Sequence, residues 1–116
     1  MSGKKQLCDL TVTTAEQFEE LRKGGRVLVF LHFDDSRWRS TAERLVQGGV
    51  VDYCKGRGIT LVSVDVDSVP EVRNHYDFLS NPQAYAFGSH GVKLGTHAGI
   101  THASGLITSL IEWYSR

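Results

Sequence analysis

Residues Arg26–Phe33, with the sequence RVLVFLHF, decide the fold class of this chain. Six of these eight residues are apolar, and three of the six are β-branched or aromatic residues in the interior of the run. A strand that is buried on both faces has such a nearly continuous apolar sequence, and strands of this kind lie at the centre of α/β sheets. The stretch therefore predicts a central strand with helices packed on both sides.

A helix is predicted before this strand. The segment Thr13–Glu16 has the pattern of a capping box, in which a hydroxyl accepts from the backbone three residues later and Glu16 reaches back. Phe18 and Leu21 then share one helical face, and Gly24–Gly25 is expected to end the helix.

A second helix is predicted after the strand. Ser40–Glu43 repeats the capping-box pattern and is expected to open a helix that carries Leu45 on its apolar face and continues to Cys54. Gly48–Gly49 lies within it and should weaken or bend it, because an interior glycine costs about 1 kcal/mol relative to alanine.

The remaining sequence predicts a mixed sheet. The expected strands are at 59–66, at 83–87 and, as its hairpin partner, at 92–97, with a possible short strand at 7–12. One helix is expected from Pro70 to about Phe78. The last helix is expected from about Thr101, with one apolar side formed by Leu106, Ile107, Leu110, Ile111 and Trp113. Parallel crossovers followed by an antiparallel hairpin give an α/β class with helices on both faces of the sheet.

Composition limits the class of protein further. The chain has 116 residues, with 13 basic and 13 acidic side chains, and is 41% hydrophobic, which predicts one domain over residues 1–116. A net charge of zero does not favour nucleic acid as a partner. No apolar run is long enough to span a membrane, and no apolar stretch follows Lys4 and Lys5 as it would in a signal peptide, so a reducing, cytoplasmic location is expected.

The order of the elements and several single residues resemble thioredoxin. The resemblance rests on Trp38 near a helix start, the strand end at 64–67, Asn81-Pro82 before a strand, Gly91 in the hairpin turn and Gly99 before the last helix. From Trp38 to Gly99 the alignment needs no gap, and it covers essentially the whole chain. The resemblance implies a thioredoxin fold, with a central mixed sheet of four to five strands flanked by helices on both faces.

The active-site motif of that family is missing. Thioredoxins place W-C-G-P-C at the strand–helix junction, whereas residues 38–42 read Trp-Arg-Ser-Thr-Ala. Arg39 takes the place of the attacking cysteine and Ala42 that of the resolving one; a shift of one residue puts Trp38 and Thr41 there instead. Because the chemistry needs a thiolate nucleophile and a resolving thiol, dithiol exchange at this site is excluded.

The resemblance also implies a binding groove. In thioredoxins the Trp, a cis-Pro with its preceding residue, and the Gly before the last helix contact an extended peptide; these positions are Trp38, Asn81, Pro82 and Gly99 here. Arg39 lies beside Trp38, and Trp and Arg are enriched at binding hot spots, so an extended peptide or protein partner is expected. Arg37 or Arg39 would favour an acidic one. The alternative is that these residues only maintain the fold and that residues 34–39 form a solvated loop.

Two cysteines remain. Cys8 and Cys54 are 46 residues apart in sequence, which fits neither a disulfide framework nor a zinc site. Cys54 is expected to be a small buried residue of its helix and Cys8 to be more exposed. An atypical thiol oxidoreductase in cell redox homeostasis that uses Cys54 or Cys8 is therefore kept as the alternative function.

The histidines do not predict a metal site. None of the five has a ligand companion at metal-binding spacing, although His97 and His102 flank Gly99 and are candidates to approach each other. His32 stands about where the resemblance implies a buried carboxylate. No glycine-rich phosphate loop or hydrolase motif is present, so no cofactor is predicted.

Together these observations predict a thioredoxin-like protein without oxidoreductase activity that binds a protein or peptide. It acts either as a free adaptor or as a constitutive subunit of a larger complex. The sequence does not indicate its oligomeric state.

Overall fold

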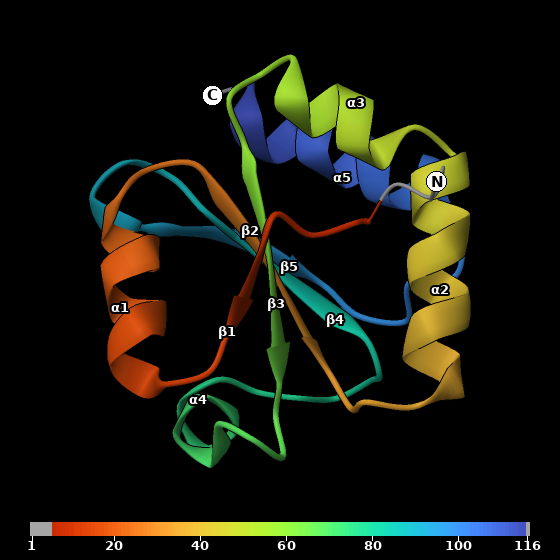
Figure 1. The fold of residues 1–116 in the computed structure, drawn as a ribbon. Coiled ribbons are helices and arrows are strands. Elements are labelled where there is room, and N and C mark those ends of the chain that lie inside the picture. The colour runs from red at the N-terminus through yellow and green to blue at the C-terminus, as the bar shows by residue number, and fades with distance from the viewer. Residues whose placement is uncertain (1–5, 116) are drawn as a thin grey trace, which may run out of the picture.

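The computed structural model describes residues 6–115 and contains a five-stranded sheet with helices on both faces (Figure 1). The strands are β1 (Leu10–Val12), β2 (Val27–His32), β3 (Thr60–Asp65), β4 (Gln83–Phe87) and β5 (Lys93–His97). The helices are α1 (Ala15–Lys23), α2 (Ser36–Gln47), α3 (Val50–Lys55), α4 (Pro70–His75) and α5 (Ala103–Tyr114), with the short 3-10 helix η1 (Ser89–Gly91).

The sheet is mixed, in the order β1-β3-β2-β4-β5. Strand β2 pairs in parallel with β3, from Val27 opposite Thr60 to His32 opposite Asp65, and antiparallel with β4. Strand β1 is parallel to β3, and β5 is antiparallel to β4. All six residues of β2 are buried, which confirms the central strand predicted from the apolar run.

Alternate residues of the strands face two separate cores. Phe30 and Leu61 point to one face, where α2, α3 and α5 cover them with residues such as Leu45 and Leu106. The other face carries Val29, Val62 and Tyr85 under Phe18 of α1 and Val72 of α4. This arrangement confirms the predicted α/β class with helices on both faces.

The first capping box is shifted by one residue from its predicted position. Thr14, not Thr13, is the N-cap of α1, and its hydroxyl accepts a hydrogen bond from the Gln17 backbone at 3.1 Å. The side chain of Gln17, not that of Glu16, reaches back and accepts from the Thr13 backbone at 2.9 Å. The prediction chose the wrong pair because two threonines and two candidate acceptors stand next to each other in the sequence.

The predicted start of the second helix is wrong. Helix α2 begins at Ser36, so Ser40–Glu43 lies inside it and caps nothing. The N-cap is Asp35, whose backbone is extended and whose carboxylate accepts from the Trp38 backbone at 2.9 Å. Aspartate and serine are about equally favoured at N-cap positions, and Asp35 precedes Ser40 in the sequence, so the helix begins five residues earlier than predicted.

The glycine pair breaks the second helix rather than bending it. Helix α2 ends at Gln47, and α3 starts at Val50 after Gly49, which adopts a left-handed conformation with φ of 89°. A residue with a Cβ is disfavoured in this conformation, so glycine permits the sharp change of direction between the helices.

Smaller differences from the predictions lie at the ends of elements. Strand β1 covers only Leu10–Val12, α4 ends at His75 rather than near Phe78, and β5 and α5 begin at Lys93 and Ala103. Ile111 was expected on the buried side of α5, but 52% of its surface is exposed. The buried stripe of that helix is Ala103, Leu106, Leu110 and Trp113, a spacing of three and four residues that leaves Ile111 outside.

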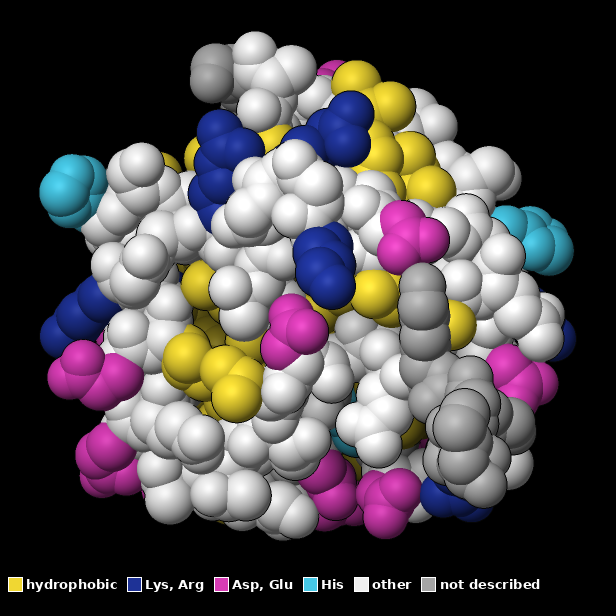
Figure 2. Space-filling model, turned by 45° about the horizontal axis from the view of Figure 1, so that its top comes forward, with side chains coloured by type: hydrophobic (Ala, Val, Ile, Leu, Met, Phe, Trp, Pro, Cys, Tyr) yellow, Lys and Arg dark blue, Asp and Glu magenta, His cyan; other side chains and the backbone are white. Residues whose placement is uncertain are grey.

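The surface has no single dominant charge in the view that brings α3 and α5 forward. Figure 2 shows acidic and basic side chains interspersed on this face, with hydrophobic side chains exposed in separate patches. Within residues 6–115, none of the helices has the length and apolar composition needed to cross a membrane.

Candidate functional site

The strand–helix junction, where the resemblance places the active site, consists of Phe33, Asp34 and Asp35. Strand β2 ends at His32 and the first helical residue of α2 is Ser36. Arg39 therefore completes the first turn of α2, and Ala42 lies further along the helix. Asp35 and Ser36 occupy the helix N-terminus, and sequence reasoning missed both; the preference of Asp for N-cap positions is the signal that points to them.

Asn81 fastens this junction to the loop before β4. Its side-chain nitrogen donates to both carboxylate oxygens of Asp35, at 2.9 and 3.2 Å, and its side-chain oxygen accepts from the Phe33 backbone at 3.0 Å. The helix N–H of Trp38 and the amide of Asn81 both lower the pKa of Asp35, with the Trp38 N–H as the larger cause. The carboxylate is thus held as an ion between two segments 46 residues apart in sequence.

A second set of bonds joins the same loop to the segment before α5. The Ser80 hydroxyl accepts from the Gly99 backbone at 2.7 Å and donates to the Pro82 carbonyl at 3.1 Å. The Asn81–Pro82 peptide bond is cis, as the resemblance implies. The structure therefore brings Asn81, Pro82 and Gly99 together, but Pro82 is buried and only Gly99 is exposed.

A buried polar network holds the other end of the loop. Gln83 is 1% exposed; its side-chain oxygen accepts from the Leu79 backbone at 2.6 Å, and its nitrogen donates to Thr96 at 3.1 Å. The hydroxyl of Tyr85 donates to the carbonyl of Asp77. Residues 77–82 are thus bonded to the sheet and to the α2 junction, which fixes their conformation.

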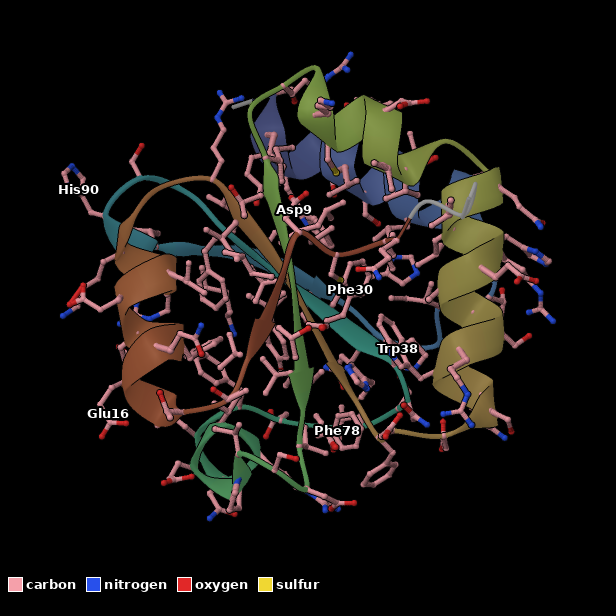
Figure 3. The ribbon with its side chains drawn as sticks, viewed as in Figure 1. Asp9, Glu16, Phe30, Trp38, Phe78 and His90 are labelled. Atoms are coloured by element: carbon pink, nitrogen blue, oxygen red, sulfur yellow. The ribbon has the colours of Figure 1, made fainter. Side chains whose placement is uncertain are left out.

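Trp38 is a packing residue as much as a surface residue. Its indole stacks on the imidazole of His32, with ring centres 4.1 Å apart and an angle of 8° between the planes, and it lies 5.6 Å from the ring of Phe30. Figure 3 shows the side chain pointing from α2 toward the sheet and Phe30. Trp38 remains half-buried, so only part of the indole is available to a partner.

His32 is buried at the end of β2. Its Nδ1 lies 2.9 Å from the Phe33 carbonyl, and Nε2 has no hydrogen-bond partner among the described residues. Burial lowers the pKa of this imidazole, although the bond to the carbonyl and the nearby Asp65 oppose the effect. Since the carbonyl requires a donor, the neutral ring carries its proton on Nδ1.

We expect the stability of the protein to fall as the pH drops below about 6.5, the ordinary pKa of histidine. The pKa of His32 in the folded protein lies below that value, so the unfolded chain binds more protons in this pH range. Between the two pKa values, one such group lowers the free energy of unfolding by up to about 1.4 kcal/mol for each pH unit. The stability linked to neutral His32 is complete at neutral pH. It is lost as the pH falls from the pKa of the unfolded state toward the pKa of the folded state. Urea unfolding at a series of pH values measures the slope.

The matched variant for this measurement is His32→Phe, which keeps a ring against Trp38 but does not titrate. Its slope should be shallower than that of the wild type, with a remainder from His97, whose pKa burial also lowers. Equal slopes in the two proteins would show that His32 is not the group responsible.

The fixed loop contributes two residues to an apolar group that includes an exposed leucine. The Leu79 patch, as we call it, consists of Phe33, Phe78 and Leu79. Leu79 is 79% exposed, and the two half-buried rings meet edge to face at 5.1 Å. The guanidinium of Arg73 lies 5.3 and 5.6 Å from the ring centres of Phe33 and Phe78. Figure 3 places Phe78 near the end of β2 that leads into the junction. Sequence reasoning missed this patch.

The charge of Arg39 is partly neutralised. Its guanidinium donates to Asp34 at 3.2 Å, with both side chains largely exposed. Such surface pairs contribute little to stability. The segment is helical from Ser36 onward, so it is not a loop over its whole length, but its Asp34–Arg39 pair is solvated as the alternative expects.

Neither thiol has the environment of a nucleophile. Cys54 is fully buried on α3, as predicted, and burial raises its pKa to about 12. Cys8 is half-buried, and burial raises its pKa to about 12 as well. It lines a cavity of about 730 Å³ between α2 and the β1–β3 edge of the sheet, which Trp38, Arg39 and Ala42 also line. Both thiols are thus protonated at neutral pH, whereas thiolate is the reactive form.

The two histidines near Gly99 lie in different settings. The Nδ1 of His97 is 2.9 Å from the Ser109 hydroxyl, and His102 precedes α5 without making a side-chain cap bond. Among the residues that the structure describes, no three His, Cys, Asp or Glu side chains are grouped as a metal site requires.

Comparisons with known proteins identify the fold. The chain has the thioredoxin fold. It is similar to a thioredoxin of Plasmodium falciparum, with 24% identity, a TM-score of 0.70 and coverage of 90% of this chain and 97% of the other. A thioredoxin of Malassezia sympodialis superposes with a TM-score of 0.76 at 16% identity, covering 97% and 95% of the two chains. A designed protein matches with a TM-score of 0.74 at 21% identity, over 93% and 97%.

No family model matches the sequence, and no curated protein matches it significantly. The sequence identities to the solved structures are low, so these likenesses extend to the fold and not to the chemistry.

Proposed function

We propose that this protein is a redox-inactive binding module with a thioredoxin fold, which recognises an extended apolar segment of a protein partner. The observation that carries the proposal is the Leu79 patch on a loop fixed by hydrogen bonds to Asp35, Gly99 and Gln83. Leu79 is exposed and directly follows Phe78, which packs with Phe33 and Arg73; this combination has the composition of a binding hot spot.

The loss of redox chemistry is supported by the residues at the junction. Asp35 and Ser36 occupy the helix N-terminus, where a thioredoxin would need a thiolate. Both cysteines of the chain are buried or half-buried, and burial raises the pKa of each thiol to about 12. The two free thiols also fit the reducing cytoplasm that we propose as the compartment.

The fixed loop supports binding in a different way. A surface that is already held in one conformation loses less conformational entropy when a partner docks. Because Arg39 is paired with Asp34, we propose that apolar contacts to Leu79, rather than attraction of an acidic segment, supply most of the affinity.

Leu79→Asp is expected to weaken partner binding by at least about tenfold, since one buried leucine contributes roughly 1.5–3 kcal/mol and a charge at an apolar contact is unfavourable. The measurement is affinity capture from the source cell with the wild type and the variant, with the captured proteins identified and the affinity of each candidate measured with purified protein.

Ile111→Asp is the matched control. It places the same charge on another exposed aliphatic residue, on α5, and should leave capture unchanged. Thermal unfolding of both variants verifies that they fold. A partner that binds all three proteins equally, or the absence of any saturable partner, would contradict the proposed surface.

A thiol oxidoreductase is the second candidate function. The likeness to solved thioredoxins and the position of Cys8 in the cavity wall favour it. Our expectation is that the purified protein reduces insulin no faster than dithiothreitol alone and that Cys8→Ser and Cys54→Ser leave this result unchanged. Turnover that disappears in either serine variant would establish the second candidate in place of the first.

A further inference from the structure

The cavity between α2 and the edge of the sheet has no role in the proposed function. One side is formed by the buried Ser63 of β3 and the exposed Thr11 of the edge strand β1, which stand opposite each other in the parallel pair. Its wall comes from Trp38, Ala42 and Val46, which are four residues apart and so share one face of α2.

The sequence explains why this space is open. Elsewhere on the same face of the sheet, large residues such as Phe30 and Leu61 fill the layer under the helices. At the β1–β3 edge, the corresponding positions carry the short side chains of Thr11 and Ser63. These hydroxyl side chains are too small to reach α2, and the result is a cavity of about 730 Å³. The space opens to solvent, so it is a surface pocket and not a void of the interior.

The side formed by Thr11 and Ser63 offers unused hydrogen-bonding capacity. Ser63 is 7% exposed, and its hydroxyl lies 3.4 Å from that of Thr11, which is a long contact. Ser63 also reaches the Cys8 thiol, a weak partner. Each hydroxyl has one donor and two acceptor sites, so both can bond to a polar group that enters the cavity.

The charges of the lining select against an ion. Of the described lining residues, Arg39 and Glu43 are charged; they have opposite signs, and both are exposed at the mouth. The rest of the lining includes an indole, aliphatic groups and hydroxyls. Because the charges of Arg39 and Glu43 cancel, an ion that enters loses hydration without gaining a net opposite charge from the described lining.

We propose that this cavity is a binding site for a small uncharged aromatic molecule that carries one hydroxyl or carbonyl group. The ring packs against Trp38 and the aliphatic wall, and the polar group bonds to Ser63 and Thr11. The volume lies within the range of roughly 300–1,000 Å³ that is usual for small-molecule sites.

The probe that tests this proposal is 2-naphthol, which is neutral at neutral pH, compared with 2-naphthoate, which has the same rings and a negative charge. Two-dimensional NMR of the labelled protein measures both titrations. We expect 2-naphthol to bind with a Kd below about 1 mM, with the largest shifts at Trp38, Ala42 and Ser63, and 2-naphthoate to bind at least about tenfold more weakly. Absence of saturable 2-naphthol binding, or equal binding of the two probes, would overturn the proposal.

Variants then locate the site. Ala42→Leu fills the cavity from α2 and should abolish 2-naphthol binding, whereas Ala15→Leu makes the same change on α1, on the opposite face of the sheet, and should not. Ser63→Ala removes the buried hydroxyl and should weaken 2-naphthol several-fold. Thermal unfolding checks that each variant is folded; binding that survives Ala42→Leu in a folded protein would overturn the assignment to this cavity.

Discussion

Gly95→Ala is expected to lower the free energy of unfolding by about 2–3 kcal/mol, the upper part of the usual range for overpacked sites. A Cβ at position 95 would lie 2.0 Å from Nε1 of Trp113 and 2.6 Å from its Cε2, far inside van der Waals contact. Trp113 is 6% exposed and belongs to the core that α5 forms against the sheet. The indole therefore lies directly on β5, and either the strand or the ring must shift to admit a methyl group.

Gly105→Ala provides the control for this prediction. Gly105 is inside α5, and a Cβ there would meet only the Cε1 atom of His97, at 3.9 Å. Alanine should raise the free energy of unfolding by roughly 0.5–1 kcal/mol, because it restricts the unfolded chain and favours the helix. Urea unfolding of the two variants gives opposite signs if the packing is as described; a neutral Gly95→Ala would show that Trp113 does not rest on β5.

The central features of the fold were predictable because local sequence determines them. The run at Arg26–Phe33 indicates a strand buried on both faces, since its short length, its β-branched and aromatic residues and the glycines before it favour a strand over a buried helix. The glycines at 48 and 49 marked a defect in the following helix, although the sequence alone did not distinguish a bend from a break. The alternation of elements then restricted the topology to a mixed sheet.

The start of α2 was not predictable with the same certainty, because two capping signals compete within a few residues. Asp35 and Ser40 are both good N-caps, and intrinsic preference does not separate them. In the structure the Asp35 carboxylate also accepts hydrogen bonds from the side chain of Asn81. This contact joins segments far apart in the sequence, so the sequence around α2 does not reveal it.

The candidate site was predicted only in part, because contacts between distant segments define it. Asn81, Pro82 and Gly99 were identified through resemblance, and the structure joins them through Ser80. Leu79 escaped notice because an exposed leucine in a loop has no periodicity that distinguishes it from a buried one. Trp38 was predicted to contact a partner in the groove, and its stacking on His32 gives it a structural role as well.

Replacing Asn81 tests whether the loop is held in place as the structure indicates. Asn81→Ala is expected to lower the free energy of unfolding by about 2 kcal/mol, because the half-buried N–H of Phe33 loses its acceptor and the bonds to a carboxylate are lost. The same variant should weaken binding at the Leu79 patch even though Asn81 is not part of that patch, since the loop loses one of its attachments. Urea unfolding and partner affinity measure the two effects. An unchanged free energy of unfolding would contradict the hydrogen-bonding scheme.

A double-mutant cycle with Asp35→Ser separates the contact from the cap. Serine retains an oxygen that accepts from the Trp38 backbone, so the variant mainly removes the partner of the Asn81 amide. If Asp35 and Asn81 act through each other, the double variant will lose less stability than the sum of the single variants. Strict additivity would mean that Asp35 serves only as a helix cap. The loop bearing Leu79 would then depend on Ser80, on Gln83 and on the bond between Asn81 and the Phe33 backbone, and Ser80→Ala should then weaken partner binding more than Asp35→Ser does.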